Sequence, residues 1–112
     1  MSFKVRFSKP FKRSLRHLVQ KYRQVQSDLE SAIEVLLFYP DLGKVIPNTS
    51  GVRKLRVASS NMAKGKRGGF RLLYLVDKEK CCIALLFVYA KSEKKDISRK
   101  ELESIIEEAL RE

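Results

Sequence analysis

Seven lysine and arginine side chains lie within the twenty residues from Val52 to Arg71, and the same stretch contains no aspartate or glutamate. Such a concentration of positive charge suits a polyanion. Because the whole chain carries a formal net charge of +11, nucleic acid or an acidic protein is the favoured partner. A membrane surface fits less well, since no basic amphipathic helix presents large apolar residues to lipid. The seven are Arg53, Lys54, Arg56, Lys64, Lys66, Arg67 and Arg71.

Cations in this pattern can cleave RNA without a metal ion. The 2′-hydroxyl of RNA can attack the adjacent phosphorus, and the protein must orient it, stabilise the phosphorane and protonate the leaving 5′-oxygen. The planar fork of arginine matches two phosphate oxygens, and a lysine can act as acid or base when nearby cations lower its pKa. If the first two strands of the basic stretch pair, four side chains are crowded in this way: Arg53, Lys54, Arg56 and Arg71.

A second polar group lies where the last apolar run ends, at Tyr89, Lys91, Lys94 and Lys95. Tyr89 taken alone also fits an aromatic residue in the core or at its rim. Charge runs are more often solvated surfaces or simple binding patches than active sites. The residue types alone therefore predict nucleic-acid binding, with catalysis as the less common outcome.

Other kinds of site find little support. His17 is the sole histidine, and Cys81 and Cys82 are adjacent, so no zinc spacing is present. The run KGKRGG lacks the spacing of a phosphate-binding P-loop, and acids are too sparse in the basic stretch for a two-metal nuclease. We therefore expect no metal and no cofactor. Unpaired cysteines, no signal-like apolar N-terminus and no membrane-length run predict a cytoplasmic protein without a membrane partner.

The first third of the chain predicts a strand and two helices. Residues 3–7 alternate apolar and basic, as in a strand with one buried face. Ser8 can cap a helix whose apolar stripe runs over residues 11–22. A second helix is expected to begin at residue 24 or 27, with Ser27 and Glu30 at capping-box spacing, and to end by residue 38. The short linker predicts that the two helices form an antiparallel hairpin.

The remainder predicts three strands and a helix. After a loop over residues 41–51, the strand at 52–57 places Lys54 and Arg56 on one face. A long loop over 59–69 leads to strands at 70–76 and 81–90, joined by a tight turn. Ser98 and Glu101 can open an acidic final helix.

The predicted order is β-α-α-β-β-β-α over a single domain, residues 1–112. This is an α+β fold with a mainly antiparallel four-stranded sheet, an N-terminal helical hairpin on one face and a C-terminal helix elsewhere. In this arrangement the basic stretch is displayed on a firm sheet.

The runs RKLRV, GGFRLLY and VYAKSEKKDIS, at these separations, resemble the RelE/ParE toxin superfamily, and are most similar to its HigB-like branch. The element order matches over essentially the whole chain. The resemblance implies a RelE-like fold and a toxin of a type II toxin–antitoxin pair. RelE-type members cleave mRNA in the ribosomal A site, whereas ParE-type members inhibit DNA gyrase.

The resemblance implies roles for particular residues. Lys54 and Arg56 match the two basic residues that RelE-type toxins carry on the strand after the long loop, and Arg71 matches an arginine early in the next strand. The arginine and tyrosine expected after the last strand are replaced by Ser92 and Ser98. Three residues remain as substitutes for the acid and base: Tyr89, Lys91 and Lys94.

These observations predict a ribosome-dependent mRNA endonuclease whose partners are the ribosome, mRNA and an adjacently encoded antitoxin. Arg53, Lys64, Lys66, Arg67 and Lys95 are expected to hold RNA. Two alternatives stay open, a ParE-like gyrase inhibitor and a non-catalytic RNA-binding protein of toxin-like fold.

Overall fold

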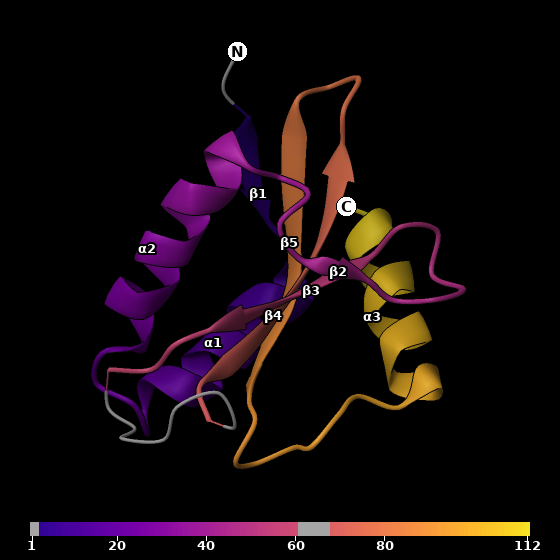
Figure 1. Cartoon of the computed structure of the whole chain (residues 1–112). Coiled ribbons are helices and arrows are strands. Elements are labelled where there is room, and N and C mark those ends of the chain that lie inside the picture. Colours follow the sequence, from indigo (N-terminus) through magenta and orange to yellow (C-terminus); the bar gives the residue numbers. More distant parts are fainter. Residues whose placement is uncertain (1–2, 61–67) are drawn as a thin grey trace.

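The computed structural model describes residues 3–60 and 68–112. One sheet crosses the molecule, and helices cover both of its faces (Figure 1). The elements are, in chain order, β1 (Lys4–Phe7), α1 (Lys9–Val19), α2 (Val25–Phe38), β2 (Lys44–Val45), β3 (Arg53–Val57), β4 (Phe70–Asp77), β5 (Cys82–Ala90) and α3 (Arg99–Leu110). The α+β class and the RelE-like arrangement predicted from the sequence are confirmed.

The sheet has five strands in the order β1-β5-β4-β3-β2. Only β1 and β5 are parallel, and every other neighbouring pair is antiparallel. The four-stranded prediction was wrong by one strand, because β2 lies within the expected loop over residues 41–51. A two-residue strand carries no periodic signal, so only its partner reveals it.

Contacts with β4 hold β2 in place. The buried Tyr74 hydroxyl accepts a hydrogen bond from the Gly43 amide at 2.8 Å and donates one to the Pro40 carbonyl at 2.8 Å. A side chain at Gly43 would come within 2.9 Å of the Tyr74 ring. Because Gly43 has no side chain, its backbone can lie against the Tyr74 ring, and the next residue, Lys44, can then pair with Lys54 in the sheet.

Two apolar clusters fill the space on either side of the sheet. One joins α1 and α2 to one face of β3, β4 and β5, and is built around Phe11, Leu29, Leu72 and Tyr74. The other packs α3 on the opposite face, where Leu102 and other residues of α3 meet β4 and β5. This accounts for the apolar character of both faces of β5, as predicted.

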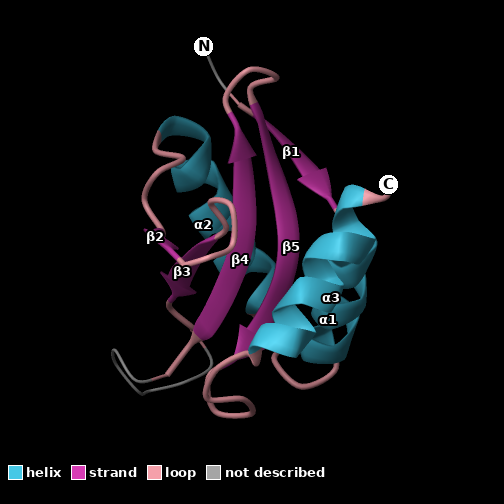
Figure 2. Ribbon diagram, turned by 90° about the vertical axis from the view of Figure 1, so that its right-hand side faces the viewer, coloured by secondary structure: helices cyan, strands magenta, loops and turns pink. Residues whose placement is uncertain are grey.

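α1 also covers the edge of β5 beyond the end of β1 (Figure 2). The Ser14 hydroxyl accepts a hydrogen bond from the Val88 amide at 3.0 Å, which satisfies a backbone donor that has no strand beside it. Ser8 caps α1 as predicted, with its hydroxyl accepting from the Phe11 amide. α1 ends at Val19, before Tyr22, because the chain turns there.

The predicted capping box of α2 is wrong. α2 begins at Val25, so Ser27 lies inside the first turn and its hydroxyl donates to the Gln24 carbonyl at 3.1 Å. At α3 the Ser98 cap is confirmed by the Glu101 amide at 3.1 Å. The Glu101 carboxylate binds the Lys94 ammonium instead of returning to the cap.

Candidate functional site

Three cations predicted from the sequence lie on the sheet face that is covered by α3. Arg56 on β3 is directly opposite Arg71 on β4, which in turn is opposite Tyr89 on β5. Directly paired residues share a face, and Lys54 joins them because it is two positions from Arg56. We call Lys54, Arg56, Arg71 and Tyr89 the polar row. The tertiary structure thus brings together four of the six predicted catalytic residues.

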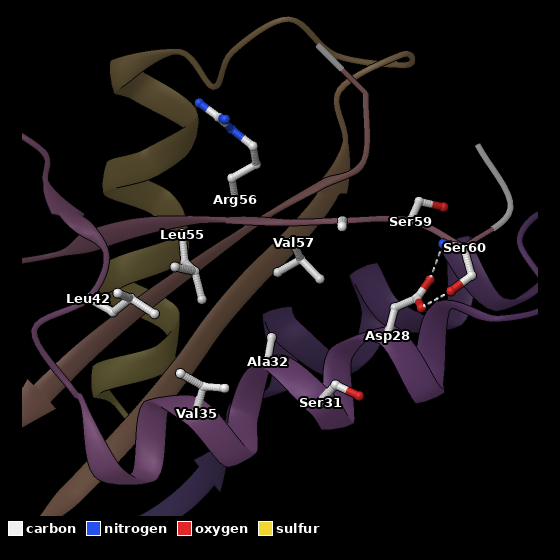
Figure 3. Close-up of a pocket in the computed structure, with 11 residues that line it drawn as sticks. Asp28, Ser31, Ala32, Val35, Leu42, Leu55, Arg56, Val57, Ser59 and Ser60 are labelled. Atoms are coloured by element: carbon white, nitrogen blue, oxygen red, sulfur yellow. Dashed lines mark hydrogen bonds between the residues drawn. The ribbon is translucent and has the colours of Figure 1, made fainter. Parts of the chain in front are cut away.

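Arg56 is the most open member of the polar row. Its side chain lies on the opposite side of β3 from Leu55 and Val57, which turn toward α2 (Figure 3). Within the described part of the chain it forms no hydrogen bond or ion pair. A cavity of about 370 Å³ opens beside it, with Lys54 and Arg71 also in its lining. An uncompensated guanidinium next to open space is suited to a phosphate oxygen.

Arg71 is held rigidly. Its side chain is buried, and its Nη1 donates to the carbonyls of Gly68 at 2.9 Å and Phe70 at 3.3 Å. Burial and then the charge of Arg56 lower the pKa of Arg71, while Tyr89 acts in the opposite direction. Arginine stays protonated under all physiological conditions, so the consequence is a fixed and poorly solvated positive charge.

Tyr89 is 4% exposed, and its hydroxyl has no hydrogen-bond partner among the described residues. Burial raises the pKa of Tyr89 to about 12; the Asp96 carboxylate adds to the effect and Arg71 opposes it. The phenol is therefore neutral at pH 7. It can donate a hydrogen bond or a proton, but it is not a base at this pH.

An acid enters the site from a distant part of the sequence. The Asp96 carboxylate lies 3.4 Å from the Lys54 ammonium and accepts the Ile97 amide at 2.8 Å. The Ile97 hydrogen bond and the Lys54 and Lys91 charges lower the pKa of Asp96 against the effect of burial. The basic stretch itself contains no acid, but the structure brings one to Lys54, because the segment after β5 folds back toward β3.

The segment after β5 is held at both ends. The Glu93 carboxylate is hydrogen-bonded to His17 at 2.8 Å and lies 3.0 Å from the Lys21 ammonium. Lys94 turns toward α3, where it binds both carboxylate oxygens of Glu101 at 2.9 and 3.0 Å. Lys91 donates to the Lys95 carbonyl. Lys91 and Lys94 are thus near the end of the polar row but engaged in structural contacts.

The predicted RNA-binding residues have different positions. Arg53 faces away from the polar row, because it is opposite Tyr74, and its guanidinium donates to the carbonyls of Asp41 at 3.0 Å and Gly43 at 2.6 Å. Arg53 therefore anchors the loop before β2, and the structure does not bring it to the site. Lys95 is exposed. Lys64, Lys66 and Arg67 lie outside the described residues.

Sequence reasoning missed Lys44. It is opposite Lys54 and so lies on the same face, at the outer edge of the sheet. The only local signal was a lysine next to an isolated pair of apolar residues, which a loop also allows. In the described residues no group of three or more His, Cys, Asp or Glu side chains is placed to hold a metal. No helix among them is long and apolar enough to cross a bilayer.

A second open feature lies between α2 and β3. A groove of about 460 Å³ is lined by Ala32, Val35 and Leu42, together with Leu55 and other residues of β3 (Figure 3). Its rim reaches Arg56. Among residues 3–60 and 68–112, β3 beyond Lys54 is paired only on the β4 side, so a sheet edge borders this groove.

The chain matches known proteins over most of its length. Residues 5–95 match the family model for the ParE toxin of the type II toxin–antitoxin system parDE. A mutant of Escherichia coli toxin RelE in the free state is 19% identical, with 99% of this chain and 97% of that chain covered and a TM-score of 0.62. The Mycobacterium tuberculosis toxin–antitoxin complex RelBE2 contains a chain that is 27% identical, with coverages of 79% and 96% and a TM-score of 0.59.

Proposed function

Since the chain belongs to the RelE/ParE superfamily of type II toxin–antitoxin toxins, we propose that it is a ribosome-dependent mRNA endonuclease. The observation that carries this proposal is the polar row, in which two arginines and a neutral phenol lie directly across three strands. A gyrase inhibitor acting by protein contact has no need of such a row.

The proposed chemistry requires no metal ion. The 2′-hydroxyl of the bound nucleotide attacks the adjacent phosphorus, the 5′-oxygen leaves, and a cyclic phosphate and a free 5′-hydroxyl result. Arg71, fixed by two carbonyls, stabilises the phosphorane, and Arg56 binds a second equatorial oxygen. The neutral Tyr89 phenol can protonate the leaving oxygen. The proton of the 2′-hydroxyl is proposed to pass to Lys91 or Lys94, which lie near the end of the row.

The ribosome supplies the other half of the proposed complex. Outside the polar row, the cations in and after the long loop, including Lys64, Lys66 and Arg67, are proposed to contact ribosomal RNA, and Lys95 the nucleotides near the scissile bond. Their charge alone supports this assignment. The formal net charge of +11 favours rapid, salt-sensitive association with such a partner.

The proposal is tested by inducing the chain in growing cells and mapping 5′ ends of translated mRNA by primer extension. We expect growth arrest with new 5′ ends inside coding regions. Growth arrest with intact messages would refute it. If a DNA-damage response accompanied intact messages, the gyrase alternative would stand, which the match to the ParE family favours.

An antitoxin partner follows from the family, and we propose that it occupies the groove between α2 and β3. Two residues that line the groove expose apolar surface, Val35 at 45% and Leu42 at 52%, and between them in the sequence Phe38 is 75% exposed and Tyr39 67%. Large apolar side chains exposed in and beside a groove are typical of a protein interface. An apolar segment flanked by acids would fill the groove and reach Arg56. Binding of the antitoxin would then also block a cation of the polar row.

A further inference from the structure

Lys44 extends the positive charge of the polar row to the edge of the sheet. It is exposed, it lies opposite Lys54, and it forms no ion pair within the described ranges. The Tyr74 contacts to Gly43 and Pro40 fix the backbone that carries it. The backbone of Lys44 is thus fixed, and no described acid neutralises its positive charge.

A second cavity lies beside the cavity next to Arg56 and shares Lys44 and Lys54 with it. It has a volume of about 390 Å³ and lies between β2 and the start of α3, with Lys44, Lys54, Asp96 and Arg99 in its lining. Lys44 and Lys54 also line the cavity beside Arg56. The Arg99 guanidinium is held at the rim by the carbonyls of Asn48 at 3.2 Å and Pro47 at 3.3 Å. The two cavities therefore share a wall of two lysines.

The contacts of Asp96 resemble those that a phosphate oxygen would make. The carboxylate accepts the Ile97 amide, lies beside the Lys54 ammonium, and is kept ionised by both and by Lys91. Its side chain is 69% exposed, and it belongs to the connection between β5 and α3. An exposed ion pair at 3.4 Å is weak. A competing anion can therefore displace this carboxylate at small cost.

We propose that the second cavity binds the phosphate of a nucleotide that flanks the scissile one, with Lys44 and Lys54 as its contacts, and that Asp96 occupies this position until RNA displaces it. Lys54 and Arg56 are two residues apart on one strand, roughly 6.7 Å, which suits consecutive phosphates of an extended single strand. The inference rests on the proposed function in that the ligand is RNA. It adds a binding site, two residues and an internal competitor.

The test measures binding rather than cleavage. The probe is a fluorescein-labelled 2′-O-methyl RNA of ten nucleotides, which lacks the attacking hydroxyl and cannot be cut. Its affinity for the full chain is measured by anisotropy across a salt series. Four variants are compared: Lys44→Gln, Lys54→Gln, Asp96→Asn and Lys12→Gln. Lys12 is an exposed lysine of α1, outside both cavities, and serves as the charge-matched control.

Lys44→Gln should weaken binding and reduce the slope of log affinity against log salt by about 0.7, the value for one contact to a single strand. Asp96→Asn should tighten binding roughly two- to fivefold, because the competing charge is gone. Lys12→Gln should leave both quantities unchanged.

The inference fails if Lys44→Gln and Asp96→Asn both behave like the control while Lys54→Gln weakens binding. It also fails if Asp96→Asn weakens binding. These outcomes leave the proposed function in place, which depends on mRNA cleavage in cells. Conversely, if messages stay intact in cells but the anisotropy series gives the expected result, the endonuclease proposal is refuted and the proposed phosphate-binding cavity is retained.

Discussion

At the scale of single residues, the polar row contains two buried polar groups that differ in their hydrogen bonding. Arg71 is buried but bonded to two carbonyls, whereas the buried Tyr89 hydroxyl has no partner among the described residues. A buried hydroxyl without a partner costs stability. Such a cost at a candidate site is consistent with a group that finds its partner in the bound RNA.

Replacing Arg71 should separate charge from geometry. Arg71→Lys keeps the positive charge but loses the fork, and Arg71→Ala loses both. We expect Arg71→Ala to reduce cleavage about 10²–10³-fold, as when one donor to a transition-state oxygen is removed. It should also lower the free energy of unfolding by about 1–3 kcal/mol, because the Gly68 and Phe70 carbonyls lose a donor.

The measurements are primer extension on translated mRNA and urea unfolding followed by circular dichroism. Arg16→Ala, at an exposed position of α1, is the control. If Arg71→Ala fails to fold, the main role of Arg71 is to stabilise the structure, and the proposed catalytic role is not supported. If Arg71→Lys cleaves as fast as the parent, the fork has no special role.

Tyr89→Phe should lower cleavage and yet leave the protein at least as stable at pH 7. The substitution removes a buried hydroxyl without a described partner, which stabilises by about 1 kcal/mol or is neutral. A parent protein that proved distinctly more stable than the variant at pH 7 would reveal a hydrogen bond to Tyr89 and contradict this account.

The same variant should change the alkaline stability of the protein. The pKa of Tyr89 is about 12 when folded, against about 10 for an unfolded tyrosine. The unfolded state therefore loses its proton first, and stability falls as the pH rises from about 10 to about 12, by at most about 2.7 kcal/mol in all. The measurement is urea unfolding of both proteins at pH 7 and pH 11. Tyr89→Phe should lose less stability between these two pH values than the parent protein. Tyr74, whose pKa is also raised, contributes equally to both proteins.

At the scale of elements, the start of β4 determines whether the row can form. Gly69 has φ of +78°, and a side chain there would come within 2.4 Å of the Val57 carbonyl oxygen. Its own carbonyl accepts the Lys91 amide at 3.0 Å. Gly69 therefore brings the ends of β3 and β5 together, one residue from Phe70 and two from Arg71.

Gly69→Ala should cost at least about 3 kcal/mol of unfolding free energy, because a left-handed conformation and a backbone clash are combined. Gly51→Ala is a matched control. Gly51 also has positive φ, +100°, but a side chain there would meet only Leu75, at 3.8 Å. It should cost about 1–2 kcal/mol. Equal losses in urea unfolding would mean that the Val57 carbonyl moves aside easily.

At the scale of the whole molecule, the sheet presents two candidate binding surfaces. The face under α3 carries the polar row, and the groove between α2 and β3 presents an apolar surface for the proposed antitoxin. Arg56 is common to both, since it lines the groove and the cavity beside the row. One partner can therefore cover the groove and reach the cations.

Val35→Glu should abolish neutralisation by the co-expressed antitoxin while cleavage and stability stay close to the parent values. Val35 is 45% exposed and lines the groove, so a charge there opposes an apolar partner without disturbing the core. Val19→Glu is the control, because Val19 is 42% exposed at the end of α1 and outside the groove. Growth rescue and co-elution on size exclusion are the measurements. Normal rescue of Val35→Glu would place the antitoxin elsewhere.

Local sequence determined the faces, caps and order of most elements. Alternation alone placed Lys54 and Arg56 together on one side of a strand, and Ser8 and Ser98 were recognisable as caps, because these signals act over two to four residues. The helices were located by periodicity, with errors only at their ends. The acid-free run from Val52 to Arg71 was equally visible without a structure.

Only the tertiary structure decided which charges meet. Strand register placed Arg56 opposite Arg71 and Tyr89, and the Tyr74 contacts created β2 and so added Lys44. The segment after β5 folds back and places Asp96 beside Lys54, 42 positions away. Arg53 is hydrogen-bonded to the loop before β2. These contacts depend on packing between distant segments and carry no local periodicity, so they could not be found from the sequence of either segment alone.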